Sequence, residues 1–79
     1  MIPLYGFLEG DTLGLLMLVH ADTTLGELAD KLRSAARLRA DPGERVQVWV
    51  RGAPLAAALT VRDANLSSLD RFDVRRVEH

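Results

Sequence analysis

The chain has 79 residues, contains no cysteine, and carries ten basic against eleven acidic residues, a formal net charge of −1. The lack of cysteine excludes disulfides, thiolate metal sites, iron–sulfur clusters and a cysteine nucleophile, and the balanced charge argues against nucleic acid or a membrane surface as partner. No apolar run approaches the roughly 20 residues that cross a bilayer, so we expect one soluble, unprocessed domain over residues 1–79, suited to the cytoplasm.

The N-terminal segments predict a β-hairpin. Residues 2–8 alternate loosely, Glu9-Gly10-Asp11 offers turn chemistry, and residues 13–20, LGLLMLVH, form an apolar run. In a strand, alternate residues point to opposite faces. One face of the second strand then carries Leu13, Leu15, Met17 and Val19, which suffices for a core. Leu16 and Leu18 point the other way, which indicates that something else covers the second face.

The next segment predicts a helix that begins at Thr24 and ends near Arg39 or Ala40. Its apolar residues recur at helical spacing, and Thr24 with Glu27 forms the capping-box pattern. The sequence Asp-Pro-Gly at 41–43 is a stop signal. The apolar stripe consists of Leu25, Leu28, Leu32 and Ala35 or Ala36.

Three further elements follow. Residues 45–51 alternate as a half-buried strand. We expect a turn at 52–54, a short edge strand at 55–57, and a capped helical turn opened by Thr60 and Asp63 and pinned by Leu66. The closing strand places Phe72, Val74 and Arg76 opposite Arg71, Asp73 and Arg75. In the strand at 45–51, Val46, Val48 and Val50 face away from Gln47, Trp49 and Arg51.

The order of these elements predicts an α+β fold of two layers. A hairpin, a crossover helix and further strands give the ubiquitin-like β-grasp, a mixed sheet of four to five strands with one main helix on one face. The last strand then lies beside the first. The other sheet face has no covering element in this chain, so apolar residues there meet water or a partner.

Three stretches resemble one family, the small B or gamma subunits of toluene-4-monooxygenase and related multicomponent monooxygenases. They are FLEGDTLGLLMLV at 7–19, TTLGELADKLRSAARLR at 23–39 with its DPG exit, and LTVRDANLSSLDRFDV at 59–74. The resemblance implies a ubiquitin-like subunit that docks on the large subunit of a di-iron hydroxylase and holds no metal, cofactor or catalytic residue. The chain departs from the family in its short N-terminus and in the compact stretch between Arg51 and Thr60.

The residues themselves favour no catalytic or metal site. His20 and His79 have no second ligand at metal spacing. Asp63, Asp70 and Asp73 could suggest paired carboxylates, but neighbouring arginines make an ordinary charged surface the better interpretation. The glycines lack the spacing of a phosphate-binding loop. We therefore expect no catalytic residue, cofactor or metal.

Two features favour a protein interface. Trp49, flanked by Gln47 and Arg51, has the composition of an interface anchor, although a position at the edge of the core is also open. Leu16 and Leu18 would form an apolar patch with Tyr5 or Phe7, and such patches usually mark interaction sites. The candidate interface residues are Tyr5, Phe7, Leu16, Leu18, Gln47, Trp49 and Arg51. The expected partner is the hydroxylase large subunit, with self-association of the isolated chain.

Other classes of function fit less well. A protein modifier or sulfur carrier needs a C-terminal Gly-Gly, and this sequence has no glycine after Gly52. A ferredoxin-type carrier needs cysteine. The alternative that stays open is a free-standing ubiquitin-like interaction domain of a secretion or regulatory assembly.

Overall fold

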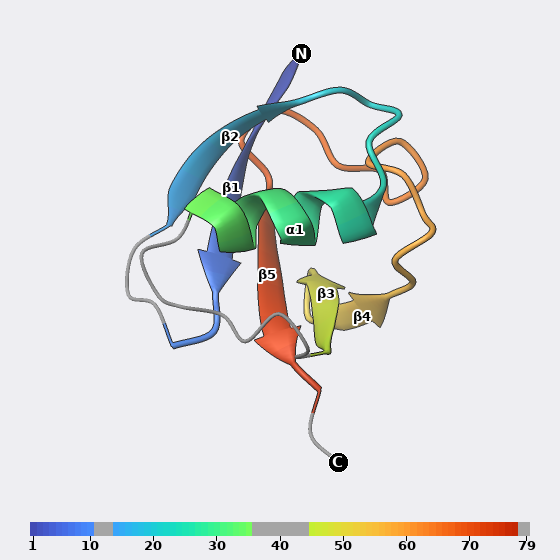
Figure 1. Cartoon of the computed structure of the whole chain (residues 1–79). Coiled ribbons are helices and arrows are strands. Elements are labelled where there is room, and N and C mark those ends of the chain that lie inside the picture. Colours follow the sequence, from blue (N-terminus) through green and yellow to red (C-terminus); the bar gives the residue numbers. More distant parts are fainter. Residues whose placement is uncertain (11–13, 36–44, 78–79) are drawn as a thin grey trace.

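A computed structural model of the chain describes residues 1–10, 14–35 and 45–77. One helix lies across a five-stranded sheet (Figure 1). The elements in chain order are β1 (Ile2–Leu8), β2 (Leu15–Val19), α1 (Leu25–Ala35), β3 (Val46–Val50), β4 (Ala53–Leu55) and β5 (Arg71–Arg76).

The sheet has the strand order β2-β1-β5-β3-β4. β1 and β5 run parallel, and the other neighbours pair antiparallel. The predicted β-grasp arrangement is confirmed, including the last strand beside the first. β5 is the central strand, β1 and β3 lie on its two sides, and β2 and β4 form the edges.

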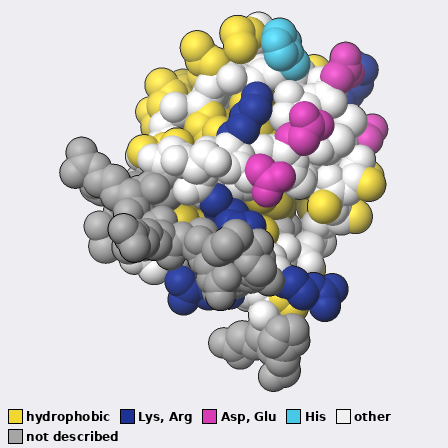
Figure 2. Space-filling view, in the orientation of Figure 1, with side chains coloured by type: hydrophobic (Ala, Val, Ile, Leu, Met, Phe, Trp, Pro, Cys, Tyr) yellow, Lys and Arg dark blue, Asp and Glu magenta, His cyan; other side chains and the backbone are white. Residues whose placement is uncertain are grey.

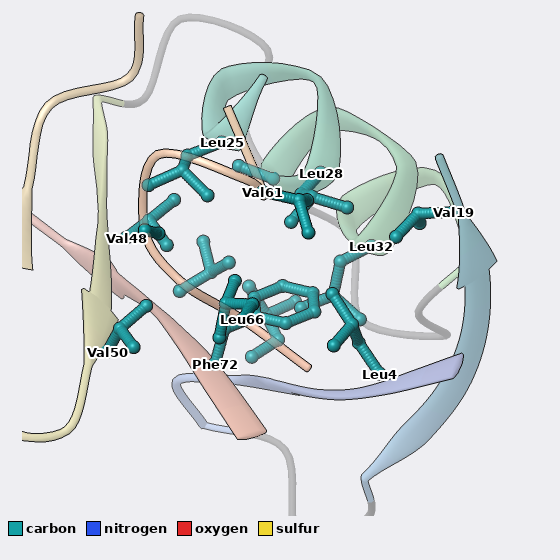
Figure 3. Close-up of a cluster of buried hydrophobic side chains, with 14 residues drawn as sticks. Leu4, Val19, Leu25, Leu28, Leu32, Val48, Val50, Val61, Leu66 and Phe72 are labelled. Atoms are coloured by element: carbon teal, nitrogen blue, oxygen red, sulfur yellow. The ribbon is translucent and has the colours of Figure 1, made fainter. Parts of the chain in front are cut away.

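The hydrophobic core lies between α1 and the sheet (Figure 3). Side chains of α1 point toward Phe72 of β5 and Leu4 of β1, and both of these are 0% exposed. Val19, Val48, Val50 and Val74 close the core from the strands. Leu25, Leu28 and Leu32 of the predicted apolar stripe are confirmed as buried, but the fourth buried residue is Ala29. Ala35 is exposed, because it lies off the face that α1 turns to the sheet, and Ala36 lies outside the described residues.

The start of α1 is capped by its own residues and by the later chain. The amide of Glu27 donates to the Thr24 hydroxyl at 3.2 Å, and the Thr24 amide donates to the Glu27 carboxylate at 3.2 Å. The amides of Leu25 and Gly26 donate to the carbonyls of Leu59 and Ala57 at 2.8 and 3.0 Å. These bonds satisfy the N–H groups that every helix start leaves free. The predicted helix end and the DPG exit lie outside the described residues, as does Leu13.

Residues 60–66 form a capped turn rather than a regular helix. The Asp63 amide donates to the Thr60 hydroxyl at 3.0 Å, and the Thr60 amide donates to the Asp63 carboxylate at 3.1 Å. One helical turn forms, with the Ala64 amide on the Thr60 carbonyl at 3.0 Å, before Asn65 adopts a positive φ of 55°. Such left-handed residues end helices. Leu66 is 6% exposed, so its predicted place in the core is confirmed.

The β3–β4 hairpin differs from the prediction. β3 ends at Val50, and Arg51 and Gly52 form the turn with φ of 53° and 79°. Two successive positive φ values are the signature of a type I′ turn, whose twist matches a two-residue hairpin. β4 therefore begins at Ala53, two residues before the expected edge strand. The prediction was wrong because Arg51 continues the polar alternation of β3 and carries no sign of a turn.

Candidate interaction surface

The face of the sheet opposite α1, here called the outer face, bears no helix in the described part of the chain (Figure 1). The strand registers decide which residues share it, because paired residues lie on the same side of a sheet. Pro3 pairs with Leu18, Tyr5 with both Leu16 and Arg71, Phe7 with Asp73, and Trp49 with both Asp73 and Pro54. The outer face thus runs from Leu18 at one edge to Pro54 at the other.

The β2 side of the outer face is apolar and exposed. We call Pro3, Tyr5, Leu16 and Leu18 the apolar margin. Leu16 and Leu18 are 57% and 59% exposed, and Tyr5 is 40% exposed. Viewed from the helix side, hydrophobic side chains also gather toward the upper left of the molecule, over β2, while charged groups are scattered elsewhere (Figure 2). The predicted exposure of Leu16 and Leu18 is confirmed.

A row of charged residues on β5 divides the outer face. We call Arg71, Asp73 and Arg75 the charged stripe. Asp73 accepts from Nε of Arg71 at 2.9 Å and lies 3.9 Å from a guanidinium nitrogen of Arg75. The predicted placement of these three residues opposite Phe72 and Val74 is confirmed. β5 is central in the sheet, so its outward residues lie between the apolar margin and Trp49.

The two arginines of the stripe cover the two aromatic rings that flank it. The Arg71 guanidinium lies 4.0 Å from the centre of the Phe7 ring, and that of Arg75 lies 4.5 Å from the Trp49 ring. Both distances suit cation–π contacts. Phe7 and Trp49 are accordingly half-buried. The result is a surface on which flat aromatic and guanidinium groups alternate.

Trp49 does lie on the outer face, but Arg51 is not the arginine beside it. The Arg51 guanidinium reaches the loop before β5, where it donates to the carbonyls of Ala64 and Asn65 at 3.3 and 2.9 Å and contacts Asp70 at 3.4 Å. The turn at Arg51 ends the strand alternation, so its side chain leaves the line of Trp49. Arg51 supports a loop instead of lining the Trp49 surface.

Gln47 also has a structural partner. Its side-chain amide donates to the Leu55 carbonyl at 2.6 Å and so ties β3 to the residue that ends β4. The group is half-buried. The side-chain amide of Gln47, a residue expected beside Trp49, is therefore already hydrogen-bonded within the chain.

The acidic residues that could suggest catalysis each have a structural partner. Asp63 caps its turn, Asp73 is held by two arginines, and Asp70 accepts from the Ser67 amide at 2.9 Å. The Ser67 amide and hydroxyl, with Arg51 nearby, lower the pKa of Asp70 below its usual value. Over residues 1–10, 14–35 and 45–77, no group of three His, Cys, Asp or Glu side chains is placed to hold a metal ion. His20 is exposed, and His79 lies outside the described residues.

Sequence reasoning missed three contributors to this surface. From the sequence, Arg71 and Arg75 are indistinguishable from ordinary surface charge, and only the sheet order brings them over Phe7 and Trp49. Leu69 is 57% exposed, and its amide donates to the Pro3 carbonyl, which places it beside the apolar margin. Its positive φ of 66° is unusual for leucine, and no sequence signal indicates it. No helix in the described residues is long and apolar enough to span a membrane.

The fold recurs in several solved structures. One is a ubiquitin of Caldiarchaeum subterraneum, with a TM-score of 0.79 and 16% identity over 99% of this chain and 95% of that chain. Another is a chain of a structure described as "Toluene 4 monooxygenase HD Complex with Inhibitor 4-Bromobenzoate", with a TM-score of 0.80 and 20% identity over 96% of this chain and 98% of that chain. A third comes from a structure described as "Molecular Mimicry of SUMO promotes DNA repair", at 0.76 and 19% over 92% and 88%. These likenesses establish the fold.

Comparison of the sequence with family models identifies the family of the chain. A search of the curated proteins gave no match. The family described as "Toluene-4-monooxygenase system protein B (TmoB)", in contrast, matches residues 1–75, nearly the whole chain. The chain therefore belongs to the toluene-4-monooxygenase system protein B family.

Proposed function

We propose that this protein is the noncatalytic B, or gamma, subunit of a di-iron hydroxylase that acts on toluene or related aromatic compounds, and that its outer face docks on the large subunit. Family membership makes it a component of a monooxygenase system. The observation that carries the docking step is the exposure of Leu16, Leu18 and Tyr5 on a sheet face that α1 does not cover.

The size of the apolar margin fits a docking site. Apolar area buried from water contributes about 25 cal/mol per Å², or about 1.5–3 kcal/mol for a leucine taken from full exposure to burial. Leu16 and Leu18 begin more than half exposed, so together with Tyr5 they offer several kcal/mol on burial, by the same order-of-magnitude conversion. That gain offsets part of the cost of ordering two proteins in one complex.

The charged stripe adds selectivity to this surface. Asp73 compensates the charge of one of the two arginines, so the stripe keeps a net positive charge. The stripe lies between the apolar margin and Trp49. A partner surface that is apolar at its sides and carries a carboxylate opposite the stripe complements it. We assign the stripe to orientation and the apolar margin to affinity.

A noncatalytic role agrees with the chemistry of the described residues. Asp63, Asp70 and Asp73 serve as caps or ion-pair partners. The two groups with lowered pKa, Glu27 and Asp70, owe the shift to local hydrogen bonds at a helix start and in a loop. Both shifts have a local cause, since Thr24 bonds Glu27 and Ser67 bonds Asp70. The oxidation chemistry is accordingly assigned to the hydroxylase partner.

Coexpression with the large subunit of a toluene-4-monooxygenase-type hydroxylase tests the proposal. The wild-type chain is expected to copurify with the large subunit. The double variant Leu16→Arg/Leu18→Arg should be lost from the complex, because it places two charges in the contact. Asp30→Arg makes the same change in net charge on the exposed side of α1 and should copurify normally.

A different result would redirect the assignment. If the large subunit never copurifies with the wild-type chain, and the gene stands apart from hydroxylase genes, the free-standing interaction domain becomes the better interpretation. If Asp30→Arg is lost and the double leucine variant retained, docking occurs through the helix side.

A further inference from the structure

The two edges of the sheet differ in the main-chain groups that they offer to another strand. In β1, the Tyr5 amide donates to the Asp70 carbonyl at 2.9 Å, and the Pro3 carbonyl accepts from the Leu69 amide at 2.6 Å. Main-chain groups of a strand alternate between its two neighbours. The odd-numbered residues of β1 therefore bond toward β5, and the even-numbered residues bond toward β2.

This alternation fixes the direction of every main-chain group in β2. The even residues Ile2, Leu4 and Gly6 pair with Val19, Met17 and Leu15. The N–H and C=O groups of those three β2 residues therefore form hydrogen bonds with β1. The N–H and C=O groups of Leu16 and Leu18 consequently point away from the sheet, at its open edge.

The opposite edge is protected against further pairing. Val50 and Ala53 flank the two-residue turn and pair with each other, so the outward main-chain position of β4 falls on Pro54. Proline has no N–H to donate, and β4 is only three residues long. Short strands and proline are the usual means by which proteins prevent pairing at an edge.

β2 carries none of these protections. Its five residues, Leu-Leu-Met-Leu-Val, include no charge and no proline. The same two residues that point main-chain groups outward also hold the most exposed side chains of the strand, Leu16 and Leu18. An exposed, uncharged edge strand of this kind is a template for strand addition.

We propose that an extended segment of the hydroxylase partner adds to β2 as a further strand, bonding the main-chain groups of Leu16 and Leu18. The inference rests on the proposed function and names its mode of contact. Side chains of the added strand on the outer face lie against Leu16 and Leu18, so uncharged residues, β-branched or aromatic, suit those positions.

A second copy of this chain is a poorer occupant than a larger partner. Two β2 strands joined to each other would extend the sheet sideways and leave Tyr5, the charged stripe and Trp49 open on both copies. A hydroxylase subunit can supply the strand and also a body that covers the outer face. One partner then accounts for the open edge and the apolar margin together.

Amide hydrogen exchange of the isolated chain and of the copurified complex tests the pairing. In the isolated chain, the amides of Leu15, Met17 and Val19 are expected to exchange slowly and those of Leu16 and Leu18 quickly. In the complex, Leu16 and Leu18 should slow by about tenfold or more, because both amides acquire acceptors.

A pair of variants separates the main chain from the side chain. Leu18→Ala shortens the side chain and keeps the N–H, whereas Leu18→Pro also removes an N–H that β1 does not use. Proline is tolerated where the N–H of an edge strand faces solvent. Leu18→Pro should weaken the complex by about tenfold beyond Leu18→Ala, as expected for a lost main-chain hydrogen bond.

The outcomes distinguish this inference from the function on which it rests. If the complex forms but Leu16 and Leu18 still exchange quickly, strand addition is wrong and the accessory role stands. If no complex forms, the proposed function fails first. If the isolated chain is a dimer with both amides already protected, the edge belongs to a second copy and the assignment to the hydroxylase is overturned.

Discussion

Replacing Gly6 with alanine tests how tightly the core joins β1 to β5. A Cβ at Gly6 would lie 2.6 Å from Cζ of Phe72 and 3.1 Å from Cδ1 of Leu32, whereas ordinary contacts begin at 3.4 Å. Gly6 does not have a positive φ, so alanine suits its backbone and the whole penalty is steric. Phe72 and Leu32 are 0% and 1% exposed, so either side chain can give way only by moving against other core residues.

The expected cost follows from overpacking. An extra carbon forced into a well-packed core costs about 1–3 kcal/mol, and the reduced freedom of the unfolded chain returns about 0.4–1 kcal/mol. We expect a net loss of about 1–2 kcal/mol, or about 5–15 °C in Tm for a domain of this size. β1 cannot shift to relieve the overlap, because it is bonded to β2 and β5 on both sides.

Thermal unfolding followed by circular dichroism measures this loss, and a second substitution identifies its cause. Phe72→Leu removes the ring carbons that meet the new Cβ, so it should offset part of the Gly6→Ala penalty in a double-mutant cycle. Gly52→Ala is the control. Gly52 has open space around it and a φ of 79°, so alanine is costly there through the backbone alone, and Phe72→Leu should not relieve it. A Gly6→Ala protein as stable as the wild type would refute the packing of β1 against β5 described above.

Three further predictions concern the helix cap and the outer face. Thr24→Ala should lower the free energy of unfolding by about 1 kcal/mol, because the cap to the Glu27 amide is lost. Bonds from the Thr24 amide and hydroxyl lower the Glu27 pKa below 4.5, so the stability they supply is present above pH 4.5 and is lost as pH falls through the lowered pKa. Thermal unfolding across that range should show this dependence, weakened in Thr24→Ala. Trp49→Ala should leave the fold nearly intact, by circular dichroism, while weakening the copurified complex. The isolated wild-type chain should self-associate, as measured by sedimentation, or bind a hydrophobic dye, as measured by fluorescence. Leu16→Arg/Leu18→Arg should reduce both.

Each of these has a result that contradicts it. An acid limb unchanged in Thr24→Ala would mean that the Thr24 hydroxyl does not contribute to the lowered pKa of Glu27 and that the main-chain amide, which the variant keeps, supplies it. Severe unfolding of Trp49→Ala would place the ring in the core and not at the interface. A monomeric wild-type chain that binds no dye would count against the apolar margin as a docking site.

Local rules in the sequence determined the parts of the fold that depend on neighbours along the chain. The stripe of Leu25, Leu28 and Leu32 and the cap formed by Thr24 and Glu27 require only helical spacing, so both are present as predicted. The same holds for Thr60 and Asp63, whose capped turn closes within four residues. Alternation likewise assigned Leu16 and Leu18 to the exposed face, because a period of two is enough to separate the faces of a strand.

Tertiary structure decided what lies beside what. Arg51 continues the alternation of β3, yet the turn that joins β3 to β4 draws it to positive φ and toward the loop at 64–70. Arg75 takes its place beside Trp49 only because β5 pairs with β3. Contacts of this kind join residues distant in the chain, and no local pattern encodes them.

The candidate surface therefore has two origins. Its apolar residues follow from the alternation of β1 and β2, which the sequence carries by itself. Three other features follow from the strand order, which places β5 at the centre and β2 at the edge. They are the charged stripe that divides the face, the cation–π contacts of its two arginines, and the unpaired main-chain groups of Leu16 and Leu18. Strand order depends on packing the whole chain around α1, so only the folded structure determines it.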